Sequence, residues 1–248
     1  LVEHNSVILS AVKTLVLDEA DRMLDLGFTE ELQRILALLP KQRQNLLFSA
    51  TFPESIQALS AQLLQQPVLI QLTHNNTPAP AITQRAIAVD KEKRTALLRH
   101  LLNTEQWSRA LVFVATKYAT EHVADKLRRH QINATAFHGE LSPGARSQAL
   151  AAFKAGQLQV LIATDLAGRG IDIDQLPVVV NYDLPRSTED YTHRIGRTAR
   201  AGGSGIAINF ISADNEAHFR LIEKRQQMRL TREQIVGFEP STLTPTVI

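Results

Sequence analysis

The chain has 248 residues, a length that predicts one large domain or two small ones. Its 44% apolar and 21% charged residues are close to the averages of soluble globular proteins and exclude a disordered or fibrous chain, and no apolar run reaches the roughly 20 residues of a membrane-spanning helix. The net charge is only +2, yet residues 1–73 are acidic and residues 74–248 are basic, which permits a polyanionic partner without requiring one.

The first part of the chain alternates predicted strands and helices. Apolar runs at residues 12–17 and 46–48 predict buried strands, and each run ends abruptly at polar residues. Between them, residues 30–39 carry leucine and isoleucine at helical spacing, and a second helix is predicted over residues 54–65. A third short apolar run at residues 68–70 predicts one more strand. This alternation is typical of a parallel sheet flanked by helices.

The second part of the chain repeats the same pattern after a predicted linker at residues 74–81, which holds two prolines and two asparagines without apolar periodicity. The predicted strands are 110–114, 134–137, 160–163, 178–182 and 206–211. The predicted helices are 92–102, 118–129, 144–155, 188–195 and 215–227. Residues 82–236 are therefore expected to form a complete five-stranded unit, and residues 237–248 a tail.

Two carboxylates, Asp18 and Glu19, stand at the end of the first predicted strand. In parallel α/β sheets, ligands collect at the carboxyl ends of the strands. A carboxylate there can hold the Mg²⁺ that bridges nucleotide phosphates, and a neighbouring glutamate can accept a proton from an attacking water. The alternative is that both residues cap the following helix, where acidic side chains are favoured.

Three further segments carry polar side chains that are candidates for binding or catalysis. Residues 49–51 (SAT) follow a strand, and the alternative for them is a turn closed by local hydroxyl bonds. Residues 163–172 combine glycines, a threonine and two aspartates after a strand, although an ordinary strand exit would look similar. Residues 193–200 (HRIGRTAR) hold three arginines spaced by three, which would share one face of a helix. Guanidinium groups suit phosphate, but a solvated basic face is the ordinary explanation.

Taken together, these four segments resemble the motifs of DEAD-box ATP-dependent RNA helicases. The tetrapeptide at 18–21 (DEAD) and the segments at 49–51, 164–172 and 193–200 occur in the order and at the approximate separations of that family. The surrounding sequence is most similar to the bacterial RhlE type. The resemblance implies a RecA-like fold, with residues 1–73 as part of the first lobe and residues 82–236 as a complete second lobe.

The resemblance also implies site residues. Asp18 would bind Mg²⁺ through water, and Glu19 would position the hydrolytic water of ATP. Asp172, beside Gly170, would contact the ribose. Arg197 and Arg200 would be arginine fingers on the γ-phosphate, and His193 would bridge toward the opposite lobe.

Other residues would bind RNA or couple the lobes. The sugar-phosphate contacts of the family map to Thr116, Gly139, Arg146 and Thr164, and such contacts give affinity without sequence readout. The coupling residues map to Asp21, Ser49, Thr51 and Arg169. Three positions depart from the family pattern: Pro143 stands where a glutamine is common, Gly168 where alanine is usual, and Ala199 where glycine is usual.

The sequence contains no G-x-x-x-x-G-K-[ST] segment, the loop whose backbone cradles phosphates. In the family this loop precedes the DEAD tetrapeptide, so the sequence is expected to begin midway through the first lobe. We therefore expect the parent protein to be an ATP-dependent RNA helicase. A polypeptide of these 248 residues alone is expected neither to bind ATP tightly nor to hydrolyse it.

Two rival functions are retained. The first is a non-catalytic RNA- or protein-binding module built on the second lobe, and the second is a DNA helicase of the same superfamily, which the DEAD spelling disfavours. An incomplete first lobe would expose apolar faces and strand edges, so self-association is also expected. The absence of cysteine excludes disulfides and thiolate chemistry and is compatible with the cytoplasm, where we place the protein.

Overall fold

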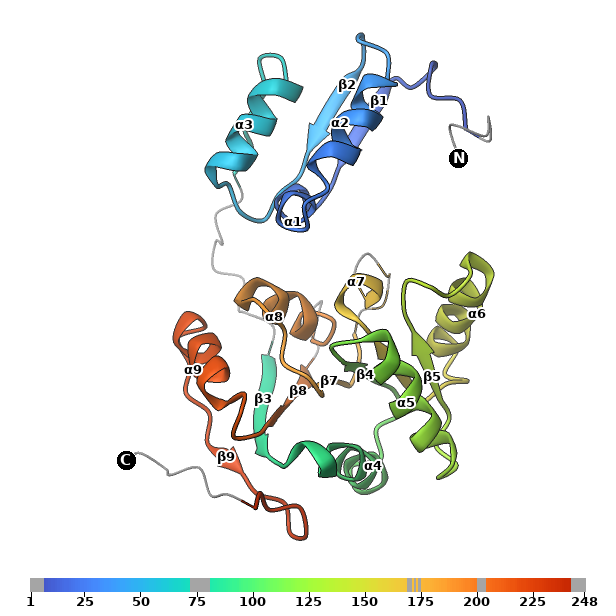
Figure 1. Ribbon diagram of the computed structural model, residues 1–248, viewed down its shortest axis with the longest axis vertical. Coiled ribbons are helices and arrows are strands. Elements are labelled where there is room, and N and C mark those ends of the chain that lie inside the picture. Colours follow the sequence, from blue (N-terminus) through green and yellow to red (C-terminus); the bar gives the residue numbers. More distant parts are fainter. Residues whose placement is uncertain are drawn as a thin grey trace. The chain divides into compact units, whose positions relative to one another are not determined.

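The computed structural model describes residues 7–71, 81–168, 171, 173, 175–199 and 204–241. The chain divides into two compact units, Leu1–Asn75 and Asn76–Ile248, and each is described by itself (Figure 1). Within the described part of the chain, no helix has both the length and the apolar character needed to cross a bilayer. Four residues singled out by the sequence lie outside the described residues: Arg169, Gly170, Asp172 and Arg200.

Unit 1 is built around a parallel pair of strands. β1 (Thr14–Leu17) pairs with β2 (Gln44–Leu47), and the register places Leu17 opposite Leu47. The helices of this unit are α1 (Ala20–Asp25), α2 (Thr29–Ala37) and α3 (Glu54–Leu63). Leu32 of α2 and Ile56 of α3 are buried against Leu17, because each helix turns its apolar side to the strands.

The strand predicted at residues 68–70 is wrong. These residues have no regular structure, and Val68, Leu69 and Ile70 are 85%, 73% and 78% exposed. β-branched and aliphatic residues favour a strand only where a neighbouring strand pairs with them, and the described part of unit 1 supplies no partner for this run.

Unit 2 contains a parallel sheet of seven strands within the described residues, in the order β5-β6-β4-β7-β8-β3-β9. The strands are β3 (Ala81–Ala88), β4 (Ala110–Phe113), β5 (Ala134–Phe137), β6 (Val160–Ala163), β7 (Val178–Asn181), β8 (Ser204–Ile211) and β9 (Arg232–Glu233). The expected five-stranded set is thus too small, because β3 and β9 add to it. All pairs are parallel, so the carboxyl ends of the strands share one edge.

Helices cover both faces of this sheet (Figure 1). They are α4 (Arg94–Thr104), α5 (Lys117–Arg128), α6 (Pro143–Lys154), α7 (Asp165–Gly168), α8 (Thr188–Ile195) and α9 (Glu216–Arg225), with a 3-10 turn at Lys91–Lys93. Helices α4 and α5 pack on the face that presents Val112 and Ile162. Helix α6 packs on the opposite face, where Leu111 and Leu161 point. Strands buried on both faces explain the nearly continuous apolar runs in the sequence.

The boundaries of unit 2 extend beyond those expected. Ala81, placed in the linker by the sequence, is the first residue of β3. Phe238, placed in the tail, packs against the core on the side of α4 and tilts against the ring of His100. Ser241 donates from its backbone and its hydroxyl to Asp90 at 2.9 and 2.7 Å. Residues 237–241 are therefore an ordered part of the unit.

Candidate functional site

In unit 1, Asp18 and Glu19 directly follow β1 at the carboxyl end of the strand. The Asp18 carboxylate is exposed and accepts a hydrogen bond from the Glu19 backbone at 2.9 Å. Glu19 takes a left-handed backbone with φ 50° and begins α1 without a side-chain capping bond. The cap interpretation of this pair is therefore not supported, and the Asp18 carboxylate is open to solvent.

The second aspartate of the tetrapeptide contacts the SAT segment. Both the backbone and the hydroxyl of Thr51 donate to Oδ2 of Asp21, at 2.9 and 2.7 Å. Ser49 donates to the Thr51 carbonyl at 2.7 Å, which is the local turn bond expected for such a segment. Partial burial acts to raise the pKa of Asp21, but the bonds from Thr51, the Arg22 backbone and Ser49 outweigh it and lower the pKa.

We predict that Thr51→Val raises the pKa of Asp21, because the variant keeps the backbone donor but loses the hydroxyl that stabilises the ionised carboxylate. Unit 1 should also lose about 1 kcal/mol of stability at neutral pH. NMR titration of the Asp21 carboxyl carbon measures the pKa directly. Thr14→Val is the matched control, since Thr14 is an exposed threonine on β1. An unchanged Asp21 titration in Thr51→Val would contradict the prediction.

In unit 2, three of the residues expected to contact RNA lie along the carboxyl edge of neighbouring strands. Thr116 follows β4, Gly139 follows β5 and Thr164 follows β6, and β5, β6 and β4 are adjacent in the sheet. Thr116 also caps α5 by accepting from the Ala119 backbone at 3.1 Å. Arg146 lies on α6, with its guanidinium 5.3 Å from the ring centre of Phe137. The fold thus brings these four residues toward one end of the sheet.

Arg194, one of the three arginines of the HRIGRTAR segment but given no site role by the sequence, is held by several hydrogen bonds. Its side chain is 3% exposed and forms a bidentate pair with Asp165, with distances of 2.6 and 2.8 Å. It also donates to the Asn181 side chain at 2.9 Å and to the Asp183 carbonyl at 2.6 Å. The ring of Phe113 lies 4.8 Å away. Arg194 therefore joins α8 to the turn that follows Thr164.

The expectation that these arginines share one helix face is wrong for Arg194 and Arg197. Helix α8 ends at Ile195, so Arg197 lies beyond the helix that carries Arg194. Arg197 is 9% exposed and donates to the Ile171 carbonyl at 3.0 Å. His193 is half-buried in the last turn of α8. Arg194, which is bonded to Asp165, and Arg197, which the resemblance assigns to the nucleotide, are thus separated by the end of α8.

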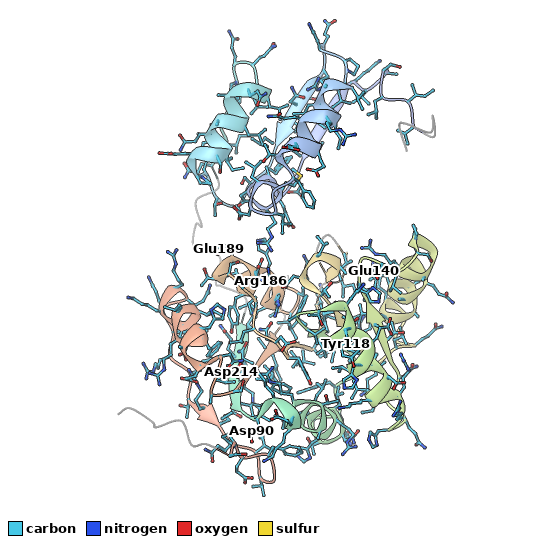
Figure 2. All side chains as sticks on the ribbon, viewed as in Figure 1. Asp90, Tyr118, Glu140, Arg186, Glu189 and Asp214 are labelled. Atoms are coloured by element: carbon cyan, nitrogen blue, oxygen red, sulfur yellow. The ribbon has the colours of Figure 1, made fainter. Side chains whose placement is uncertain are left out.

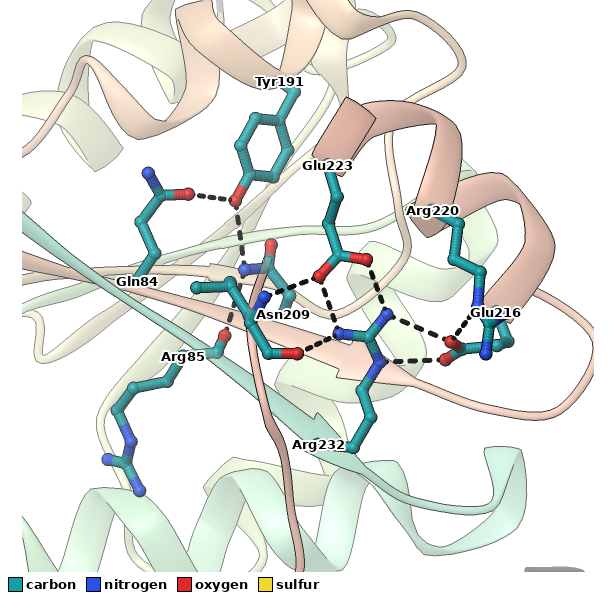
Figure 3. A network of polar contacts seen from close by, with 9 residues as sticks. Gln84, Arg85, Tyr191, Asn209, Glu216, Arg220, Glu223 and Arg232 are labelled. Atoms are coloured by element: carbon teal, nitrogen blue, oxygen red, sulfur yellow. Dashed lines mark hydrogen bonds and ion pairs between the residues drawn. The ribbon is translucent and has the colours of Figure 1, made fainter. Parts of the chain in front are cut away.

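A buried polar network continues from Arg194 into the sheet. Asn181, which accepts from Arg194, donates to Asn209 at 2.8 Å. Asn209 donates to the Tyr191 hydroxyl at 3.1 Å, and Tyr191 donates to Gln84 at 2.6 Å (Figure 3). Burial raises the pKa of Tyr191, so its hydroxyl keeps the proton that this chain of bonds requires. Sequence reasoning missed this network, although Asn181 and Asn209 interrupt apolar runs, which is the pattern expected of buried polar partners.

The structure shows the backbone or packing around each of the three residues that depart from the family pattern. A Cβ atom at Gly168 would lie 2.6 Å from a ring carbon of Phe113, so the ring position found here requires glycine. Ala199 has φ 52°, a left-handed conformation that glycine adopts more readily than alanine. Pro143 is the first residue of α6, a position where its missing N–H costs no hydrogen bond.

The chemistry of the donors in unit 1 fits a magnesium ion held mainly by water and phosphate. Mg²⁺ keeps several waters and takes one or two protein carboxylates, and Asp18 and Glu19 supply such groups at the end of a strand. The described residues contain no cluster of three or more His, Asp or Glu side chains that could form an all-protein metal cage. This donor set is therefore compatible with a nucleotide-bound ion rather than a structural one.

Both units thus place helices on a parallel sheet and polar residues at the carboxyl ends of strands, the architecture of RecA-like nucleotide-dependent proteins. Family comparison agrees with this assignment. Residues 1–59 match the DEAD/DEAH box helicase family, and residues 92–202 match the helicase conserved C-terminal domain. The chain belongs to the DEAD-box helicase family.

Individual relatives support the assignment. The chain is 42% identical over 238 residues to the ATP-dependent RNA helicase DeaD of Mycobacterium tuberculosis, covering 96% of this chain and 42% of that protein. It is 40% identical over 229 residues to the ATP-dependent RNA helicase DbpA of Escherichia coli, covering 92% of this chain and 50% of that protein. The chain thus spans about half the length of these curated relatives, or less. Because they are DeaD and DbpA proteins, the RhlE subtype stays a prediction.

Solved structures give the same result. Saccharomyces cerevisiae Dbp5 bound to RNA and ADP BeF3 matches with a TM-score of 0.80 and 30% identity, over 94% of this chain and 62% of that one. The Escherichia coli DEAD-box protein SrmB bound to RraA matches with a TM-score of 0.63 and 36% identity, over 68% of this chain and 99% of that one.

Proposed function

We propose that the chain is part of an ATP-dependent RNA helicase that separates short RNA duplexes locally. The observation that carries this proposal is the placement of motif residues at the carboxyl ends of strands in both units, together with the contact between Asp21 and Thr51. Family membership and the similarity to Dbp5, whose solved structure contains RNA and ADP BeF3, support it.

Each motif residue has a role in the proposal. Asp18 would bind Mg²⁺ through water, and Glu19 would hold the water that attacks the γ-phosphate. Arg197 would stabilise the charge that develops on that phosphate. The remaining nucleotide and bridging residues are proposed by resemblance alone: Gly170, Asp172, His193 and Arg200.

RNA is proposed to bind at the carboxyl edge of unit 2 through its sugar-phosphate backbone. Thr116, Gly139 and Thr164 lie at successive strand ends of that edge, and Arg146 supplies a cation from α6. Contacts of this kind position a strand without reading its sequence. The domain limits expected from the sequence, and coupling through Asp21, Ser49, Thr51 and Arg169, belong to the same proposal.

The proposed reaction cycle depends on the two units acting together. ATP and single-stranded RNA would each be contacted by residues of both lobes, so binding of both ligands favours closure. A strand held in the closed state in a bent form cannot stay paired, and hydrolysis would release it. The coupling contact within unit 1 would link the carboxylates to the SAT segment during this cycle.

An ATPase assay with RNA tests the proposal. A polypeptide of these 248 residues is expected to show no turnover, because it lacks a phosphate-binding loop. A longer protein, in which an N-terminal segment that carries a phosphate-binding loop is joined to this chain, should hydrolyse ATP, with stimulation by RNA greater than by DNA of equal length. In that longer protein, Glu19→Gln should reduce turnover by at least about 100-fold, the lower range for general base catalysis.

Two results would contradict these expectations. Turnover by the 248-residue polypeptide would refute its proposed inactivity. Equal stimulation by DNA would favour the DNA helicase alternative over the RNA helicase.

A second candidate function is a non-catalytic binding module formed by unit 2. The match to SrmB covers 99% of the SrmB chain but only 68% of this chain, so the solved SrmB chain is shorter than this one. It was solved bound to the protein RraA, which favours a protein-binding role for a unit of that size. Binding of RNA or protein by unit 2, with no ATPase activity in the longer protein, would support this alternative.

We also propose that unit 1 self-associates. Val16 on β1 and Phe48 just after β2 are 54% and 53% exposed, so apolar side chains border an open two-stranded sheet. Light scattering that shows a strict monomer at high concentration would oppose this. A cytoplasmic location belongs to the proposal as well, on the ground that a chain without cysteine suits a reducing compartment.

A further inference from the structure

The first turn of α5 lies at the carboxyl edge of unit 2, beside two of the residues proposed to contact RNA. Thr116 caps the helix at the end of β4, and Lys117 is its first residue. Lys117 forms an ion pair with Glu140, the neighbour of Gly139 in the loop after β5. The residue that follows Lys117, Tyr118, is therefore placed at the rim of the proposed RNA surface (Figure 2).

Tyr118 presents its ring to solvent and not to the core. Its side chain is 73% exposed, whereas the buried residues of α5 lie on another face, at Thr120, Val123, Ala124 and Leu127. Side chains of a helix lean toward its N-terminus, so a ring at the second position of α5 leans toward the edge of the sheet. Packing within unit 2 does not explain this large exposed aromatic side chain.

His122 supports the ring from one helical turn further along. The two rings are stacked, with centroids 5.7 Å apart and planes inclined by 15°. Stacking against one neighbour restricts the tyrosine rotamer, while the high exposure of Tyr118 leaves ring surface for another planar group.

The carboxylates near this pair have partners that reduce their repulsion of an anionic strand. Glu140 pairs with Lys117, Glu121 contacts His138 at 3.0 Å, and Asp183, which accepts from the Ala115 backbone, pairs with Arg94. The hydrogen bond from Lys117 lowers the pKa of Glu140, so the Glu140 carboxylate stays ionised at neutral pH. Lys126, one turn beyond His122, is exposed and adds a positive charge.

We propose that Tyr118, held by His122, is a stacking platform for an unpaired base of single-stranded RNA. The inference rests on the proposed function, because the backbone contacts of Thr116, Gly139 and Thr164 would bring the strand to this rim. Proteins that bind single strands commonly stack bases on exposed aromatic rings, and such stacking tolerates any base. The platform would therefore add affinity that depends on the presence of a base but little on its identity.

The test compares two fluorescent probes on the 248-residue chain: a single-stranded RNA of ten nucleotides and an oligonucleotide of the same length with stable abasic residues. Tyr118→Ala is expected to weaken binding of the RNA by about 5-fold or more, the lower range for loss of one stacked base. The same variant should bind the abasic probe as well as the wild type does. Tyr118→Phe should keep the wild-type affinity for RNA, because it keeps the ring.

A spectroscopic readout separates stacking from a general structural effect. In Tyr118→Trp, RNA should quench the fluorescence of the new tryptophan, and the abasic probe should not. Leu221→Ala is the control for loss of an exposed apolar side chain, since Leu221 is 62% exposed on α9. This control should bind both probes like the wild type.

The outcomes separate the inference from the proposed function. RNA binding that is equal in the wild type and Tyr118→Ala would overturn the stacking platform and leave the RNA-binding proposal intact. Equal weakening of both probes by Tyr118→Ala would also overturn it, because the ring would then act on the backbone. Failure of the wild-type chain to bind RNA at all would overturn the proposed RNA surface and the platform with it.

Discussion

Replacement of Arg194 by alanine is expected to lower the free energy of unfolding of unit 2 by about 3–5 kcal/mol, the range for removing one partner of a buried ion pair. The variant leaves the Asp165 carboxylate without its bidentate partner and the Asn181 side chain and Asp183 carbonyl without a donor. Urea unfolding followed by fluorescence measures the change, because the single tryptophan of the chain, Trp107, lies in the core of unit 2.

Two variants sharpen this measurement. Arg194→Lys keeps the charge but loses the planar fork, so it should still destabilise unit 2, by less than the alanine variant. Arg186→Ala removes an exposed arginine from the loop before α8 and should change stability by no more than about 0.5 kcal/mol. A loss below about 1 kcal/mol for Arg194→Ala would show that the network around Asp165 does not stabilise the fold.

The position of Arg194 also bears on the proposed mechanism. The Asp165 turn begins directly after Thr164, which is proposed to contact RNA, and α8 leads into Arg197, which is proposed to contact the nucleotide. The pair of Arg194 with Asp165 therefore joins the two segments within one unit. A rigid link of this kind would hold both proposed contacts in a fixed relation while RNA and nucleotide bind.

The parts of the fold that the sequence predicted well are those in which local pattern and burial agree. β5 and β6 have the predicted bounds, because strands buried on both faces read as short apolar runs. β3 was missed because its polar residues are satisfied by distant partners: Gln84 by Tyr191, and Arg85 by Glu233 and Glu105. Such partners are far away in the sequence and have no fixed spacing.

In the candidate site, too, local patterns could be predicted from the sequence, whereas contacts between distant segments could not. Residues at strand ends, such as Asp18 and Thr164, could be found because a strand followed by polar residues is a local pattern. The contact between Asp21 and Thr51 could not be derived, since it depends on the parallel pairing of β1 and β2. The role of Arg194 was hidden for a further reason: three arginines spaced by three look alike until the end of α8 separates them.

Arg232→Ala is expected to have the second large effect, a loss of about 3 kcal/mol in the stability of unit 2 at neutral pH. Arg232 of β9 pairs with Glu216 and Glu223 of α9, with four hydrogen bonds between 2.8 and 3.0 Å (Figure 3). Its guanidinium also lies 4.9 Å from the ring centre of Phe219. The variant would leave two largely buried carboxylates facing each other with fewer cationic partners.

The pH dependence of this loss identifies its cause. Burial acts to raise the pKa of Glu216 and of Glu223, but the bonds from Arg232 outweigh it and hold both below the ordinary value of 4.5. A lowered carboxylate pKa contributes stability that is fully present above about pH 4.5 and is lost as the pH falls through the folded-state pKa. The difference between wild type and Arg232→Ala should therefore be largest at neutral pH and shrink as the pH falls, beginning above pH 4.5, because burial raises the carboxylate pKa once Arg232 is removed. Trp107 fluorescence in urea measures both proteins, with Lys224→Ala, an exposed cation on the same helix, as the matched control. A difference that grows as the pH falls below 4.5 would contradict the assignment, because protonated glutamates have no charge for Arg232 to stabilise.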